Sequence, residues 1–188
     1  MHSASNEFAL SAMPHDSNKR EFVPLKIAVL TVSDTRTEAT DTSGGLLCER
    51  LTAAGHTLAD QQINPDDVYR IRATVATWIA DPDIQVVITT GGTGVTGRDG
   101  TPEAVSPLLD KTIDGFGEMF RALSWKDIGT STLQSRCLAG VANGTYIFCL
   151  PGSTGACATG WDELIEKQLD YRTRPCNLAE LLPRLTEH

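Results

Sequence analysis

The stretch from residue 86 to residue 103 constrains the fold most, because an apolar β-branched run leads directly into a loop with five glycines. The Thr-Pro-Glu sequence at residues 101–103 follows and has the composition of a helix start. A strand, a glycine loop and a helix in this order are typical of phosphate sites, since glycines admit close approach and free N–H groups attract negative charge. The carboxylate of Asp99 would repel a phosphate unless a cation lay between them, so the loop also indicates Mg²⁺.

The loop by itself does not identify the ligand. Gly92, Gly94 and Gly97 have the spacing of the dinucleotide fingerprint, but the expected helix begins beyond the last glycine instead of inside the motif. A Walker A loop would need a lysine, and this loop contains none. A flexible surface loop without a phosphate role is therefore the alternative to phosphate or nucleotide binding.

Length and charge restrict the classes of partner. The chain has 188 residues, of which 40% are hydrophobic and 21% charged, and this fits one globular domain better than two. Asp and Glu number 24 against 16 Lys and Arg, which gives a net charge of -8. Nucleic acids and anionic membranes repel such a chain, so we expect neither as a partner. A phosphorylated ligand must be held locally, by backbone N–H groups, a few arginines and a metal ion.

Cysteine and histidine usage excludes further classes. The five cysteines are scattered without a C-x-x-C pair, which argues against a zinc site. No apolar stretch approaches a signal-peptide core or the roughly 18 residues of a membrane span, and we expect a cytoplasmic protein. His2 and His15 lie in the expected tail and His188 is the last residue, which leaves His56 alone inside the expected fold, so the histidine-dependent chemistry of serine and cysteine hydrolases has almost no candidate residue.

The hydrophobic pattern predicts a three-layer α/β/α domain with a mostly parallel sheet and a β-hairpin insertion. Residues 1–24 lack periodicity and are predicted to be a mobile tail, with one domain over residues 25–188. Strands are expected at residues 26–33, 57–63, 84–90, 137–142 and 145–150, with a hairpin turn at Asn143–Gly144. Helices are expected after Asp41, Asn64, Thr101 and Ser153, at residues 119–125 with Met119, Phe120, Leu123 and Trp125 on the apolar face, and at residues 177–185.

Several polar residues have both a functional and a structural interpretation. Asp34 follows the first strand at its carboxyl end, where parallel sheets bind ligands, but it can also be an ordinary turn residue. Asn64 and Pro65 read as a helix cap and first position, which would explain Asp66 and Asp67 as first-turn acids without chemistry. A second strand, glycine loop and helix begins after residue 150, and the two loops are expected to form two walls of one crevice. The alternative there is a plain turn from strand to helix.

A set of motifs in fixed order resembles the MoaB/MogA family of molybdenum cofactor biosynthesis proteins. The resemblance covers residues 25–180 and looks most like the bacterial MoaB branch. It is carried by residues 32–34, 41–44, 89–94, 98–103, 115–118, 120–124, 128–136, 150–152 and 173–177.

The resemblance implies an activity and a set of site residues. Adenylyltransferases of the family transfer AMP from Mg-ATP to the terminal phosphate of molybdopterin and release pyrophosphate. It implies Asp66 and Asp99 as catalytic acids that bind Mg²⁺, with ATP as co-substrate. It implies a nucleotide site at Thr90, Gly91, Gly92, Thr93, Gly94, Pro151, Gly152 and Ser153, and a molybdopterin site at Ser33, Arg98, Ser135 and Arg136. The family also forms homotrimers or homohexamers and works with other enzymes of the pathway.

Adenylylation suits a chain with few histidines. The attacking phosphate is already ionised, so catalysis needs alignment and charge neutralisation more than a general base. One alternative is a protein that binds or carries molybdopterin without turning over ATP, for which Asp66 and Asp99 would not need to bind Mg²⁺. Another is a nucleotide-dependent sensor supported by the dinucleotide spacing alone, which a thermal-shift preference for nicotinamide over ATP would favour.

Overall fold

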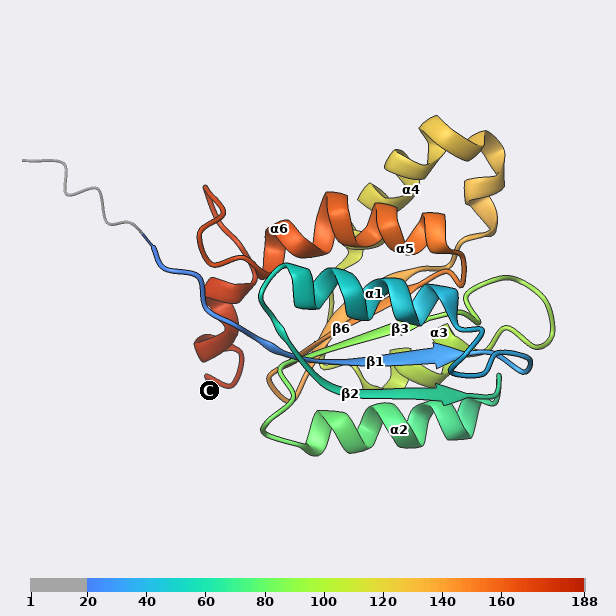
Figure 1. Cartoon of the computed structure of the whole chain (residues 1–188), viewed down its shortest axis with the longest axis horizontal. Coiled ribbons are helices and arrows are strands. Elements are labelled where there is room, and N and C mark those ends of the chain that lie inside the picture. Colours follow the sequence, from blue (N-terminus) through green and yellow to red (C-terminus); the bar gives the residue numbers. More distant parts are fainter. Residues whose placement is uncertain (1–19, 188) are drawn as a thin grey trace, which may run out of the picture.

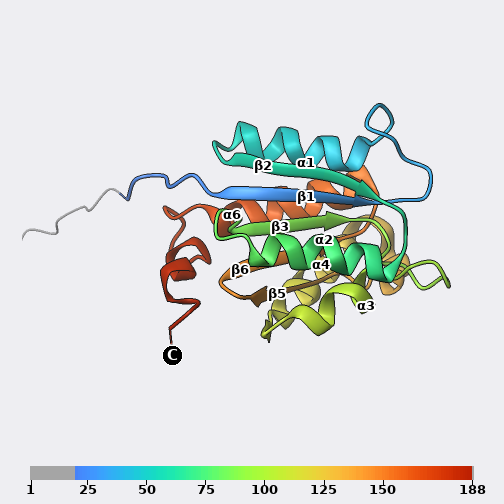
Figure 2. The same cartoon turned by 90° about the horizontal axis from the view of Figure 1, so that it is seen from below.

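The computed structural model describes residues 20–187, which form a mixed six-stranded sheet with helices on both faces (Figure 1). The strands run in the order β2-β1-β3-β6-β5-β4, and Figure 2 shows this order from β2 to β5. Their bounds are β1 Lys26–Val32, β2 Thr57–Asn64, β3 Val86–Thr90, β4 Lys111–Thr112, β5 Leu138–Ala142 and β6 Thr145–Leu150. The strands β2, β1, β3 and β6 are parallel, and β5 and β4 continue the sheet antiparallel. The predicted fold class is therefore confirmed.

Helices form the outer two layers. One face carries α1 (Thr42–Ala53), α4 (Asp114–Ile128), α5 (Thr154–Gly160), the π-helix η3 (Trp161–Ile165) and α6 (Glu166–Leu169). The other face carries α2 (Val68–Ala80) and α3 (Thr101–Val105). Three 3₁₀ helices complete the described chain: η1 (Ser106–Leu108), η2 (Gly129–Gln134) and η4 (Ala179–Arg184). No helix among residues 20–187 is both long and apolar enough to cross a membrane.

Two hydrophobic cores lie on the two faces of the sheet, because successive side chains of a strand point to opposite faces. Ile27 and Val29 of β1 belong to the core under α1 and α5, whereas Ala28 and Leu30 belong to the core under α2 and α3. All four side chains are 0% exposed, as expected for a central parallel strand covered on both sides. The continuous apolar run of this strand follows from that double burial.

Helix α2 begins later than the sequence predicted. Asn64 still pairs with Val32 as the last residue of β2, so it cannot serve as the helix cap. The cap is Asp67, whose carboxylate accepts the N–H groups of Tyr69 (3.0 Å) and Arg70 (2.9 Å). The interpretation of Asn64 as cap is wrong, and Asp66 lies in the connection before the helix instead of in its first turn.

The starts of α3 and α4 also differ from expectation. Gly100 precedes α3 as its cap residue, and the hydroxyl of Thr101 instead donates to the carbonyl of Gly91 at 2.8 Å. Helix α4 begins at Asp114, ahead of the predicted start, and buries Phe116 and Phe120. Met119 and Trp125 were predicted on its apolar face, but they are 52% and 56% exposed.

The part of the predicted tail that the structure describes, residues 20–24, packs against the body. The guanidinium of Arg20 donates to both carboxylate oxygens of Glu180 (2.9 and 2.7 Å) and lies over the ring of Tyr171. The ring of Phe22 lies 5.0 Å from that of His56. These contacts extend the packed chain to Arg20, and the rest of the predicted tail lies outside the described residues.

His56 is a buried histidine, and we expect it to make stability depend on pH. Its Nδ1 accepts the N–H of Leu25 at 3.2 Å, and burial lowers its pKa below the ordinary value. In the unfolded chain His56 takes up a proton near pH 6.5, whereas in the folded chain it does so only at lower pH. The unfolding free energy should therefore fall as pH drops below about 6.5.

A His56→Asn variant tests this prediction, because the Asn Oδ1 can still accept the Leu25 N–H. Urea unfolding of both proteins at pH 7.5 and 5.5 should give a smaller pH dependence for the variant. The difference in slope is at most about 1.4 kcal/mol per pH unit for one proton. Equal pH dependence in both proteins would contradict the prediction.

Candidate functional site

The two glycine loops lie side by side because they follow neighbouring parallel strands. The last residues of β3 and β6, Thr90 and Leu150, are register partners. The N–H of Gly91 donates to the carbonyl of Leu150 at 3.0 Å, and the Thr90 hydroxyl donates to the carbonyl of Pro151 at 3.1 Å. The two loops thus meet at one edge of the sheet, where open α/β folds bind ligands.

Close backbone approach explains two of the glycines. Gly91 has a φ of +101°, and an added Cβ would overlap the carbonyl oxygen of Val32 at the end of β1. A Cβ on Gly152 would lie 3.1 Å from the Cα of Gly91, so no side chain separates the two loops. The loops therefore present peptide groups, and not side chains, along this wall.

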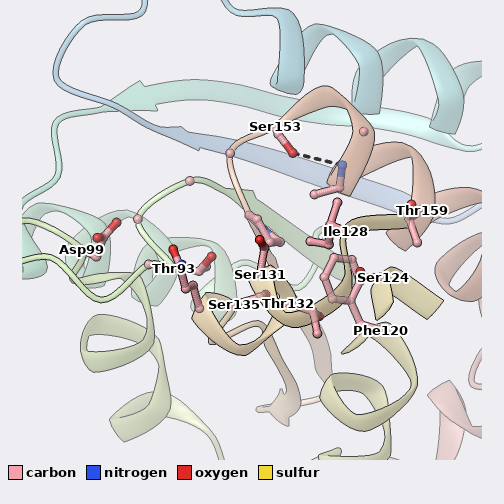
Figure 3. Close-up of a pocket in the computed structure, with 18 of the residues that line it drawn as sticks. Thr93, Asp99, Phe120, Ser124, Ile128, Ser131, Thr132, Ser135, Ser153 and Thr159 are labelled. Atoms are coloured by element: carbon pink, nitrogen blue, oxygen red, sulfur yellow. Dashed lines mark hydrogen bonds between the residues drawn. The ribbon is translucent and has the colours of Figure 1, made fainter. Parts of the chain in front are cut away.

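An open pocket of ≈ 570 Å³ lies along both loops and is closed on its other side by α4 and η2 (Figure 3). Its volume is in the range of small-molecule and cofactor sites. The lining residues are Val32, Gly91, Gly92, Thr93, Gly94, Asp99, Phe120, Ser124, Asp127, Ile128, Ser131, Thr132, Gln134, Ser135, Pro151, Gly152, Ser153, Gly155, Ala156 and Thr159. Among the described residues that line it, Asp99 and Asp127 are the only charged ones, so this lining carries two carboxylates and no Lys, Arg or His. Both loops border the same crevice, but they lie side by side on one wall, and the prediction that they form two separate walls is wrong.

Asp99 belongs to the lining and is held in its ionised form. One of its carboxylate oxygens accepts both the N–H (2.8 Å) and the hydroxyl (2.6 Å) of Thr96. The hydrogen bond from the Thr96 side chain is the main reason that the pKa of Asp99 is lowered. The pocket therefore has a fixed negative charge at neutral pH, close to the glycine loop.

Asp66 lies beside the same loop but outside the pocket lining. Its carboxylate accepts the N–H of Gly100 at 3.2 Å. Burial raises the pKa of Asp66, and the charges of Asp99 and Asp34 raise it further. The Asp66 carboxylate is thus repelled by both Asp99 and Asp34, and a bound cation would relieve this repulsion.

The donors fit Mg²⁺ only as part of a shared site. Within residues 20–187, no three His, Cys, Asp or Glu side chains gather closely enough to hold a metal ion. Mg²⁺ is commonly held by one or two carboxylates together with substrate phosphates and water, and Asp66 and Asp99 can supply the carboxylates. A metal here would depend on the oxygens of a bound phosphate.

Arg136 holds the glycine loop in place. Its Nε donates to the carbonyl of Gly94 (2.7 Å), its Nη2 donates to the carbonyl of Asp99 (3.0 Å), and its Nη1 pairs with Glu103. The guanidinium is therefore engaged by the protein on all three nitrogens. Its neighbour Ser135 lines the pocket, and the Ser135 Oγ is buried without a hydrogen-bond partner in the described chain.

The remaining predicted substrate residues lie outside the pocket lining. Arg98 pairs with Asp34 through Nε (3.0 Å) and Nη2 (2.6 and 2.7 Å). The hydroxyl of Ser33 accepts the N–H groups of Thr35 and Arg36, both at 3.2 Å. Of the four residues predicted to bind molybdopterin, the structure brings only Ser135 into the lining. Of the predicted nucleotide-binding residues, Thr90 is buried behind the pocket lining and does not belong to it.

Sequence reasoning missed the wall formed by α4 and η2. Figure 3 shows Asp99 and Thr93 toward one end of the pocket and Phe120 toward the other. The hydroxyl-rich run of residues 129–135 after the helix was the available signal, because loops with many Ser and Thr suit polar ligands. The lining residues that were not predicted are Val32, Phe120, Ser124, Asp127, Ile128, Ser131, Thr132, Gln134, Gly155, Ala156 and Thr159.

Comparisons with known proteins agree with this architecture. The profile of a family described as "Probable molybdopterin binding domain" matches residues 28–171. Molybdenum cofactor biosynthesis protein B of Escherichia coli is 57% identical over 157 residues, which cover 84% of this chain and 92% of the relative.

Solved structures are similar over nearly the same region. A crystal structure of molybdenum cofactor biosynthesis protein B has a TM-score of 0.81 and 39% identity, covering 90% of this chain and 100% of that one. The tungsten cofactor synthesizing protein MoaB from Pyrococcus furiosus has a TM-score of 0.72 and 34% identity, covering 87% and 98%. The chain therefore belongs to the MoaB/MogA family of molybdenum cofactor biosynthesis proteins.

Proposed function

We propose that the protein is a molybdopterin adenylyltransferase, which transfers AMP from Mg-ATP to the terminal phosphate of molybdopterin and releases pyrophosphate. The observation that carries the proposal is the pocket itself. It combines a wall of glycine peptide groups with the ionised carboxylate of Asp99 and no cationic side chain in its lining. Such a lining binds a polyphosphate more tightly when a divalent cation accompanies it, because the cation offsets the charge of Asp99. Assembly into a trimer or hexamer and a cytoplasmic location stay predictions.

The two ends of the pocket suit the two parts of such a reaction. The end at Asp99 and Thr93 offers backbone N–H groups to phosphates, as glycine loops do. The end at Ile128, whose side chain is 53% exposed above the buried Phe120, offers apolar surface on which a flat heterocycle can lie.

Catalysis by this chain would rest on positioning. Asp66 and Asp99 would hold Mg²⁺, which when bound neutralises charge on the reacting phosphates. Within residues 20–187, no histidine, lysine or cysteine lines the pocket. The nucleophile is an ionised phosphate, so no residue needs to take up a proton. The chain's own contribution is alignment of the two phosphates along a rigid backbone wall.

Molybdopterin binding without turnover is the second candidate. It is favoured by the hydrogen bond from the Gly100 N–H to Asp66, which gives this carboxylate a structural role in shaping the loop. A carrier would use the same pocket and would leave ATP unchanged.

An AMP-transfer assay separates the two candidates. Purified protein is mixed with Mg-ATP and molybdopterin, and adenylated molybdopterin and pyrophosphate are followed with time. We expect both products to rise together in equal amounts. Molybdopterin that stays bound through gel filtration while neither product appears would support the carrier instead.

A further inference from the structure

Arg98 is paired in a way that closely imitates phosphate binding. Its Nε and Nη2 both donate to the carboxylate of Asp34, at 2.6–3.0 Å. A guanidinium binds phosphate through the same two-pronged geometry. Both side chains are accessible, with 66% of Arg98 and 42% of Asp34 exposed. Solvent-exposed ion pairs of this kind contribute little to stability, so a competing anion can displace the carboxylate.

Of the two arginines on the glycine loop's flank, Arg98 is the one that can move. Arg136 is fixed by the carbonyl oxygens of Gly94 and Asp99 and by Glu103, and its departure would leave loop carbonyls without donors. Arg98 holds only one carboxylate, and that carboxylate keeps a second partner without it. The Oδ1 of Asp34 also accepts the N–H of Asp66 at 3.0 Å.

The pocket needs such an arginine because its own lining is anionic. Asp99 lines the pocket next to Arg98 in sequence, and Val32 lines it two residues before Asp34. Neither Arg98 nor Asp34 belongs to the lining, but Asp34 accepts the N–H of Asp66, and a Cβ on Gly92 of the lining would lie 3.0 Å from the Asp66 carboxylate. The Arg98–Asp34 pair therefore lies next to the glycine loop, at the end of β1. We propose that Arg98 binds the anionic group of a ligand at this site. In the free protein the guanidinium is paired with Asp34, and a phosphate-bearing ligand takes the place of the Asp34 carboxylate.

Asp34 is accordingly a positioning residue with two separable effects. It lowers the affinity for anions by competing for Arg98, and it ties the connection before α2 to the end of β1 through the Asp66 N–H. An asparagine at position 34 keeps an oxygen for that N–H but loses the charge that retains Arg98. The inference rests on the proposed function only in taking a phosphate-bearing compound as the ligand.

Calorimetric titration with inorganic tripolyphosphate, without magnesium, measures the competition directly. Asp34→Asn should bind the probe about 5-fold more tightly than the wild type, because a larger fraction of Arg98 is available. Arg98→Ala should bind it more weakly than the wild type. In the double variant, Asp34→Asn should change the Kd by less than about twofold relative to Arg98→Ala, since there is no Arg98 guanidinium for Asp34 to compete for.

A matched control is offered by Asp170 and Arg172, which lie outside the pocket. Asp170 also accepts a two-pronged guanidinium and a backbone N–H, at 2.8–3.2 Å. Asp170→Asn changes the net charge equally and should leave the Kd unchanged. An equal gain in this control, or the same gain from Asp34→Asn without Arg98, would show a general charge effect and overturn the proposal. Unchanged or weaker binding by Asp34→Asn, or no binding by any variant, would overturn it too.

The result is separable from the proposed enzymatic function. Tripolyphosphate binding requires neither molybdopterin nor turnover. Absence of AMP transfer together with tighter binding by Asp34→Asn would refute the adenylyltransferase and leave the role of Arg98 standing. AMP transfer without any effect of Asp34→Asn on anion binding would do the reverse.

Discussion

An Asp99→Asn variant is expected to lose AMP transfer by about 100- to 1,000-fold while keeping its fold and its affinity for molybdopterin. Removing one group that stabilises charge at the reacting centre commonly has an effect of this size. The asparagine oxygen can still accept the N–H and hydroxyl of Thr96, which hold Asp99 at 2.8 and 2.6 Å. The change therefore removes the charge and leaves the loop. Initial rates of pyrophosphate release at saturating Mg-ATP measure the loss.

The control for this variant is Asp83→Asn. Asp83 pairs with Lys26 at the start of β1, at the opposite end of the strand from the pocket, and 76% of its side chain is exposed. The Asp83→Asn substitution removes the same charge and should leave the rate within about twofold of the wild type, since exposed ion pairs contribute little to stability. Near wild-type turnover by Asp99→Asn would remove Asp99 from the catalytic machinery.

The largest loss of stability is expected from Gly91→Ala. The residue would have to adopt a φ of +101°, and its Cβ would overlap the Val32 carbonyl, which belongs to a central strand and cannot yield cheaply. We expect the unfolding free energy to fall by about 4 kcal/mol, within the range seen when a side chain is forced against backbone. Chemical denaturation monitored by circular dichroism measures the change.

Gly97→Ala is the matched control within the same loop. An added Cβ at Gly97 meets no atom within 4 Å, and its φ lies outside the left-handed region. The substitution should change the unfolding free energy by less than about 0.5 kcal/mol, or raise it slightly by restricting the unfolded chain. Equal effects of the two substitutions would show that the contact with Val32 is not what requires glycine at position 91.

The sheet was predictable because its signals are local. Asn143 and Gly144 adopt φ values of +46° and +81°, as the tight hairpin requires, and the apolar runs became buried strands. The cap of α2 was not predictable, since β2 pairs with β1 as far as Asn64 and only the sheet register shows this. Helical spacing likewise indicated an apolar face on α4, but only packing decides that Phe120 is buried and Met119 is not.

The site was predictable where backbone geometry creates it. The two glycine loops can be recognised from their residue types, whereas the partners of charged side chains come from segments that are distant in sequence. Arg98 and Asp34 are 64 residues apart, and Arg136 reaches Gly94 across 42 residues. The charge of each residue could be read from the sequence, but whether its partner would be a ligand or another part of the chain could not.

The backbone contact between Gly91 and Gly152 means that the two walls of the pocket differ in how freely their residues can be substituted during evolution. A side chain gained at Gly91 would overlap the Val32 carbonyl of β1, and one gained at Gly152 would press on the Cα of Gly91, so substitution on this wall is costly. The facing wall includes Ile128, which is 53% exposed, and Thr159, and these positions tolerate exchange without disturbing the sheet. Divergence of ligand preference among proteins built this way should therefore be concentrated in α4, η2 and α5, and laboratory libraries aimed at new ligands belong there.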